Sequence, residues 1–165
     1  MKVTTMNTLF AGWLPRLGFL LIIALPGYLT AQEDDAAALI DIIDAIEKGW
    51  EQGDGTPFRK HYLDFEGARY VESGGQNEGL TDLVEHHVEP EGDALSDFEL
   101  SLTDVETHFE GDFAWAIADV EVKATVNRDG RMIHNRGFET FLFRRVDGEW
   151  KVVHTHSSSR PVRSE

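Results

Sequence analysis

The chain has 165 residues, enough for one ordinary domain, and its 41% hydrophobic and 27% charged residues are typical of a globular protein. Its 30 acidic and 15 basic residues give a formal net charge of −15 without a basic stripe, which argues against nucleic acid and anionic membranes as partners. The absence of cysteine excludes disulfides, thiolate nucleophiles, cysteine-bound zinc and a lipoprotein anchor.

Residues 1–31 are predicted to be a secretory signal peptide. Lys2 and Arg16 are their only charged residues, and an apolar run covers residues 17–25. This run is shorter than the roughly 20 apolar residues that span a bilayer. We expect cleavage near Ala31, a periplasmic or secreted location, and no stable membrane insertion after cleavage. Retention as an uncleaved N-terminal anchor is the alternative.

The rest of the chain is predicted to form one domain over residues 32–158, with a short tail at residues 159–165. The first half has the apolar spacing of helices. The stripe of the first helix consists of Leu39, Ile42, Ile43, Ile46 and Trp50. A short second helix is predicted over residues 56–62, with Thr56 as its N-cap, and a third over residues 80–88.

The second half alternates apolar and polar residues with period two, which predicts β-strands. Asp-Gly pairs at residues 129–130 and 147–148 indicate hairpins. One short strand is expected before the third helix, at residues 68–72. The four long strands are expected near residues 98–102, 113–126, 133–146 and 150–157. Helices followed by an antiparallel meander predict an α+β fold.

The last hairpin can be registered from its turn. If Asp147 and Gly148 form a two-residue turn, Glu139 faces His156 and Phe141 faces His154, about 5 Å apart on one side of the sheet. Small alanines of the preceding strand are expected beside this face. They leave room there for a packed helix or for a ligand cavity.

Several short strings resemble the nuclear transport factor 2-like superfamily, specifically exported bacterial proteins with a SnoaL-like domain. The strings are residues 70–75, His86-His87, residues 137–140 and residues 150–158. The resemblance implies a cone-shaped fold, in which a curved sheet wraps around N-terminal helices and encloses a pocket, often in a dimer. It does not fix the function, because this superfamily includes isomerases, cyclases, dehydratases and binding domains.

Glu139 and His156 are the predicted catalytic residues. A carboxylate that orients an imidazole and stabilises its protonated form can make the imidazole a general base. The alternative is a structural ion pair between two strands.

The predicted ligand-binding residues are His87, His154, Tyr70, Glu72 and Phe141. His154 and His156 have a spacing that permits joint metal ligation, but two histidines alone do not make a metal site. We therefore expect no metal and no cofactor. The structural alternatives are a hydrogen-bonded core histidine at His87 and plain packing at Tyr70 and Glu72.

The sequence favours an exported protein that binds a small, partly apolar molecule between sheet and helices. One alternative is a small acid–base enzyme of the isomerase, cyclase or dehydratase type that uses Glu139 and His156. Another is a structural or partner-docking homodimer, since Trp115 and Ile117 are predicted on the opposite face of the sheet.

Overall fold

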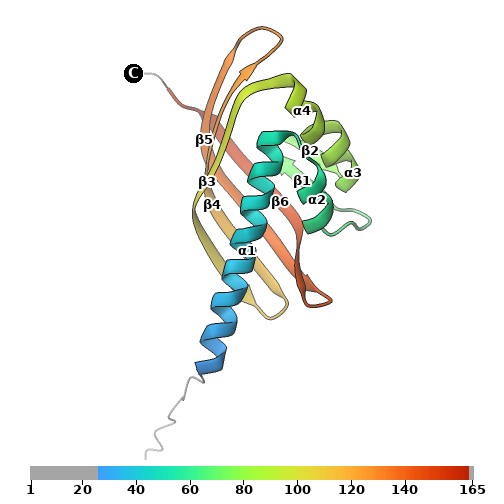
Figure 1. The fold of residues 1–165 in the computed structure, drawn as a ribbon, viewed down its shortest axis with the longest axis vertical. Helices are drawn as coiled ribbons and strands as arrows, with labels where there is room; N and C mark the ends of the chain where they lie inside the picture. The colour runs from blue at the N-terminus through green and yellow to red at the C-terminus, as the bar shows by residue number, and fades with distance from the viewer. Residues whose placement is uncertain (1–25, 164–165) are drawn as a thin grey trace, which may run out of the picture.

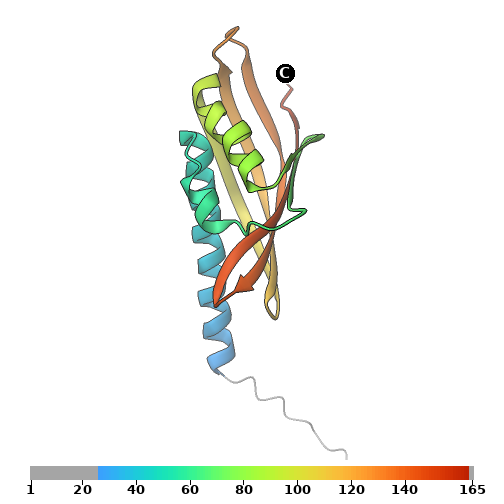
Figure 2. The ribbon, with the colours of Figure 1, turned by 90° about the vertical axis from the view of Figure 1, so that its right-hand side faces the viewer.

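The computed structural model describes residues 26–163, and their side chains from Gln32 onward. Figure 1 shows a long helix lying along a curved sheet, with shorter helices beside it. Figure 2 shows that the helices gather on one face of the sheet and leave the other face uncovered. The apolar run predicted at residues 17–25 lies outside the described residues.

Helix α1 (Pro26–Gln52) buries the predicted apolar stripe against the sheet. It begins at Pro26, and proline suits this first turn because the N–H that it lacks would have no helical partner there. Helix α2 (Thr56–His61) has Gly55 at its N-cap, so the prediction of Thr56 as the cap was wrong. The Thr56 N–H instead donates to Asp54 Oδ1 at 2.9 Å.

The third predicted helix is longer than expected and contains a wide turn. It runs through α3 (Leu80–Leu83), the π-helical turn η1 (Val84–Val88) and α4 (Glu89–Ala94). The Glu89 N–H donates to the Val84 carbonyl, five residues back. Pro90 follows, and it has no N–H to donate and crowds the carbonyl four residues before it, which favours a widened turn.

Six strands form one sheet in the order β2-β1-β6-β5-β4-β3. Strand β1 pairs in parallel with β6, and all other neighbours are antiparallel. The strands are β1 (Arg69–Glu72), β2 (Gly75–Glu78), β3 (Leu95–Glu110), β4 (Phe113–Val126), β5 (Met132–Val146) and β6 (Glu149–Pro161). The α+β prediction is confirmed. The sequence did not predict β2, and β6 continues three residues into the segment predicted as a tail.

The core lies between α1 and the inner face of the sheet. Ala114, Ala116 and Ala118 of β4 are fully buried, so the helices approach the sheet closely there. Edge strand β3 is covered by α1. Two backbone amides of β3, at Leu100 and Leu102, donate to carboxylates of α1 instead of remaining open for pairing with another chain.

Within residues 26–163, no helix is both long enough and apolar enough to cross a membrane.

The register of the last hairpin departs from the prediction beyond Phe143. Phe143 pairs with Val152 as predicted, but Leu142 pairs with His154, so Val153 is an extra residue in β6. Such a β-bulge turns every later residue of the strand to the opposite face. The structure therefore contradicts two predicted pairs.

Glu139 faces Ser157, not His156, and Phe141 faces Thr155, not His154. The loop between β4 and β5 is also longer than a two-residue turn, which places Ala118 beside Glu139. Relative to a two-residue turn at Asp129-Gly130, the pairing of β4 with β5 is shifted by two residues. It leaves the predicted alanines on the predicted face.

Candidate functional site

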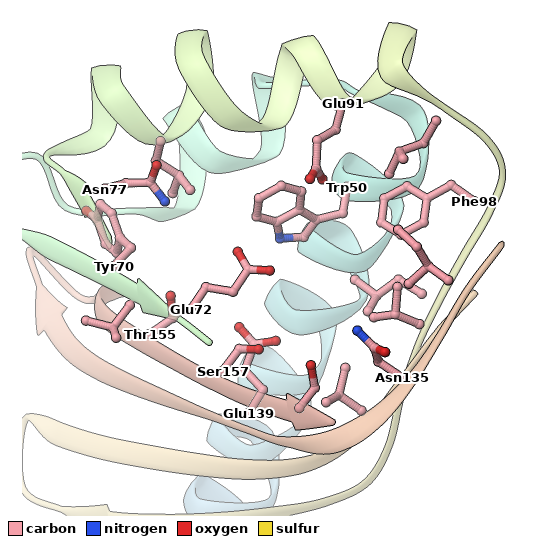
Figure 3. A pocket seen from close by; sticks show the side chains of 18 of the residues that line it. Trp50, Tyr70, Glu72, Asn77, Glu91, Phe98, Asn135, Glu139, Thr155 and Ser157 are labelled. Atoms are coloured by element: carbon pink, nitrogen blue, oxygen red, sulfur yellow. The ribbon is translucent and has the colours of Figure 1, made fainter. Parts of the chain in front are cut away.

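A cavity of about 170 Å³ lies between the inner face of the sheet and the helices α1, α3 and α4 (Figure 3). An apolar cavity of about 150 Å³ can hold benzene, so this volume suits a molecule built on about one six-membered ring. Part of its wall is apolar. The apolar residues on the β3, β4 and β5 side are Leu95, Phe98, Leu100, Val120, Val122 and Ile133.

Two glutamates enter the cavity from the sheet because of the strand register. Glu139 on β5 pairs with Ser157 on β6, and Ser157 pairs with Glu72 on β1. The three residues therefore form one row on one face, with the short serine side chain in the middle. Neighbouring strands lie about 4.8 Å apart, so two long glutamate side chains can approach each other above that serine. Both carboxyl groups project into the cavity (Figure 3).

Glu139 is the more enclosed of the two carboxyl groups. Its strand neighbours are Ala118 and Ser157, which offer it no charge. Burial raises the pKa of Glu139 to about 8, and the nearby charge of Glu72 adds to the effect. At neutral pH the carboxyl group is mostly protonated, so it can donate a hydrogen bond to an oxygen in the cavity.

Glu72 differs because it has a partner. Partial burial raises its pKa, while the imidazole of His87 acts in the opposite direction. The His87 Nε2 atom lies 3.4 Å from Glu72 Oε2, and 46% of the glutamate side chain remains exposed. The imidazole of His87 therefore opposes the rise in the pKa of Glu72, whereas Glu139 has no such partner.

Two tyrosines, Tyr62 and Tyr70, line the cavity, and Tyr70 lies at the end away from Phe98 (Figure 3). The rings of Tyr62 and Tyr70 meet edge to face, with their centroids 5.0 Å apart. Burial raises the pKa of Tyr70 to about 12, so its hydroxyl keeps its proton. This buried hydroxyl has no hydrogen-bond partner in the described part of the chain.

Three of the residues predicted from sequence line this cavity: Tyr70, Glu72 and Glu139. His87 touches Glu72 from behind the wall. Phe141 is fully buried below the cavity and does not line it. Their roles in binding stay predictions.

His154 and His156 do not belong to this site. The bulge in β6 places both on the outer face, where His154 Nδ1 lies 2.7 Å from the Arg69 carbonyl and His156 pairs with Thr140. The predicted pairing of Glu139 with His156 is therefore wrong, and so is the predicted pairing of Phe141 with His154. Across residues 26–163, no group of three or more histidine and acidic side chains has an arrangement that could hold a metal ion.

Sequence reasoning missed several residues that line the cavity. The missed polar residues are Asn77, Glu91, Asn135, Ser157 and Ser159, and the missed aromatic residues include Trp50 and Phe98. Trp50 ended the predicted apolar stripe, so its position was a usable signal. Ser157 gave none, because its face depends on the bulge.

Residues 39–163 match the SnoaL-like domain family. A nuclear transport factor 2-like superfamily protein from Salmonella enterica serovar Typhimurium LT2 has a similar fold, with a TM-score of 0.68 and 18% identity over 82% of this chain and 94% of that chain. LinA gives a TM-score of 0.68 and 17% identity over 81% of this chain and 93% of that chain.

A conserved protein from Planctomyces limnophilus DSM 3776 gives a TM-score of 0.66 and 16% identity over 79% of this chain and 99% of that chain. At these identities the likeness concerns the fold alone. A search of curated proteins gives no match. The family match covers most of the chain and agrees with a fold like that of nuclear transport factor 2-like proteins, so this chain belongs to the SnoaL-like domain family.

Proposed function

We propose that this protein binds a small, partly apolar and uncharged molecule in the cavity between sheet and helices. The observation that carries the proposal is the pair of carboxyl groups, Glu72 and Glu139, in a cavity with an apolar wall. A few placed polar groups in a mostly apolar hollow are the usual features of a small-molecule site.

The charges around the cavity argue for a neutral ligand. Three glutamates line it, and no lysine or arginine does so among the described residues. An anionic ligand would meet these carboxylates without a compensating cation. Glu139 offers a proton to a ligand oxygen, and ionised Glu72 accepts a hydrogen bond, so a ring ketone or a phenol fits the available chemistry.

Three one-ring probes test this proposal: cyclohexanone, phenol and benzoate. We expect the indole N–H signal of Trp50, which lines the cavity, to shift on titration with cyclohexanone and phenol but not with benzoate. Ser157→Phe fills the space between the two glutamates and should abolish the shifts. Ser158→Phe places the same ring on the outer face of the same strand and should leave them intact. Shifts that survive Ser157→Phe would place the binding elsewhere.

A second candidate function is proton transfer, favoured by the different surroundings of the two carboxyl groups: burial raises the pKa of Glu139 to about 8, while His87 opposes the rise in the pKa of Glu72. Glu72 would take a proton from the carbon next to a carbonyl, and Glu139 would give its proton to the carbonyl oxygen, forming an enol. In D2O, reversal of these steps replaces that hydrogen by deuterium. The protein should then accelerate deuterium exchange in cyclohexanone, and Glu72→Gln should remove the acceleration. Exchange at the buffer rate with the wild-type protein rejects this function.

We also propose a homodimer through the uncovered face of the sheet. Phe138 is 59% exposed there and Ile117 is 38% exposed, beside a stacked pair of His108 and Trp115. Apolar side chains on both faces of a sheet favour a second covering layer. Sedimentation of Trp115→Glu should give half the wild-type mass, and an unchanged mass would count against this interface.

Export with cleavage near Ala31 completes the proposal. Intact mass measurement of protein recovered from the periplasm should give a chain that begins at or near Gln32. A full-length mass in the membrane fraction would support the anchor instead.

A further inference from the structure

We propose that His87 is a positioning residue of this site, which holds Glu72 ionised from behind the cavity wall and so leaves the remaining proton on Glu139. This role in the site rests on the proposed binding function. Its geometry is independent of any ligand.

His86 and His87 both lie in the π-helical turn η1, but their side chains point in different directions. His86 projects outward, with 72% of its side chain exposed, and contacts Asp82 at 3.1 Å. His87 turns inward and is 26% exposed. Wide turns of this kind often occur at functional sites, because they change the direction of one side chain within an otherwise regular helix.

The His87 imidazole is held on three sides. Its Nε2 atom lies 3.4 Å from Glu72 Oε2 and 3.5 Å from Glu91 Oε1. Its ring packs edge to face against the ring of Trp50, with the two centroids 4.9 Å apart. Its Nδ1 atom lies 3.0 Å from the amide of Asn77. An asparagine amide can give its nitrogen to a neutral imidazole or its oxygen to an imidazolium, so this contact serves both protonation states.

The charges around His87 favour its protonated form. The acidic groups that face it are Glu91 from α4, Glu72 from β1 and Asp82 from α3. The hydrogen bond to Glu91 is the main reason why the pKa of His87 is raised, and burial acts against it. Within the described part of the chain, no lysine or arginine opposes this effect on the pKa of His87, so one imidazole lies among three acidic groups.

The two cavity glutamates therefore have different surroundings. Glu72 lies against the imidazole, whereas Glu139 on β5 lies beside Ser157, near the carboxyl group of Glu72 and the buried hydroxyl of Tyr62, and has no cationic neighbour among the described residues. A proton added to the pair is more stable on Glu139, because protonating Glu72 would remove its attraction to His87. The histidine thus decides which carboxyl group donates and which accepts.

Carboxyl ¹³C NMR titration of the unliganded protein tests this role. In the wild type we expect the midpoint of Glu72 to lie below that of Glu139. His87→Gln should raise the Glu72 midpoint by about one pH unit and lower that of Glu139. The matched control His86→Gln removes the neighbouring exposed imidazole and should move neither. An unchanged Glu72 midpoint in His87→Gln, or an equal change in His86→Gln, overturns the proposal.

A reciprocal measurement keeps the test valid if His87→Gln does not fold. Coupling between two groups acts equally in both directions, so Glu72→Gln should lower the midpoint of the His87 ring proton signals. A midpoint that stays in place overturns the proposal as well. None of these titrations needs a ligand, so a failure of cyclohexanone to bind and a failure of His87 to act are separate results.

Discussion

Glu139→Gln tests whether the cavity encloses this carboxyl group. Glutamine keeps the shape of the side chain but cannot ionise. The wild-type pKa of about 8 lies above the ordinary value of 4.5, so between these pH values the folded chain binds one more proton than the unfolded chain. Folding stability from Glu139 is therefore complete below about pH 4.5 and is lost as the pH rises through about 8.

The magnitude follows from the same values. The difference between 4.5 and about 8, at 1.36 kcal/mol for each pKa unit, corresponds to about 5 kcal/mol as an upper value. Relaxation and water entry reduce such penalties, so we expect about 2–4 kcal/mol. Relative to the wild type, Glu139→Gln should therefore gain about that much unfolding free energy on going from pH 5 to pH 9.

Urea unfolding of both proteins at pH 5, 7 and 9 measures this gain. A suitable control is Glu149→Gln, because Glu149 is exposed and its carboxylate lies 2.8 Å from Lys151. The hydrogen bond from that lysine lowers the pKa of Glu149, so the control should not gain stability at high pH. Parallel pH dependence of the wild type and Glu139→Gln would show that the carboxyl group is open to water, and would refute the reasoning.

Three further predictions concern the frame of the site. Glu47→Ala leaves the Leu102 N–H of edge strand β3 without its acceptor at 2.7 Å and should cost about 1–2 kcal/mol in urea unfolding. Gly137→Ala places a Cβ atom 1.8 Å from the Ser158 carbonyl oxygen, so the strands must separate and the melting temperature should fall by more than 10 °C. Asp35→Ala removes the carboxylate that accepts the indole N–H of Trp150 at 3.1 Å. It should lower the unfolding free energy by about 1–3 kcal/mol, measured by urea unfolding followed through tryptophan fluorescence.

The elements of the fold could be predicted because their signals are local. The apolar stripe of α1 and the alternation of β4 and β5 are visible in short windows of sequence. The Asp147-Gly148 turn fixed the pairing of its nearest four residue pairs. These local signals were sufficient for the α+β architecture.

The site was predicted only in part because it depends on nonlocal geometry. One extra residue, Val153, reverses the face of His154 and His156, and alternation alone does not show that the second of two consecutive valines is a bulge. The Glu72–Glu139 pair requires the parallel pairing of β1 with β6, which no turn encodes. These two features explain why Glu72 and Glu139 were each predicted as site residues but their pairing was not.

The interpretation of the third helix failed for a related reason. The third helix was predicted to cover residues 80–88 and so to end before Pro90, and proline usually interrupts a helix. Here Pro90 lies in α4, behind a π-helical turn that keeps the helix continuous. Glu91 therefore lies in the helix, four residues after His87 and in contact with it, instead of in a loop.

We expect the cavity to keep the Glu139 carboxyl group protonated at neutral pH, beside a Glu72 whose pKa the neighbouring His87 holds down. The titration midpoint of the Glu139 carboxyl carbon in the unliganded wild-type protein measures this directly. The account predicts a midpoint near pH 8. A midpoint near the ordinary value of 4.5 would mean that water reaches the carboxyl group freely, and it would contradict the account.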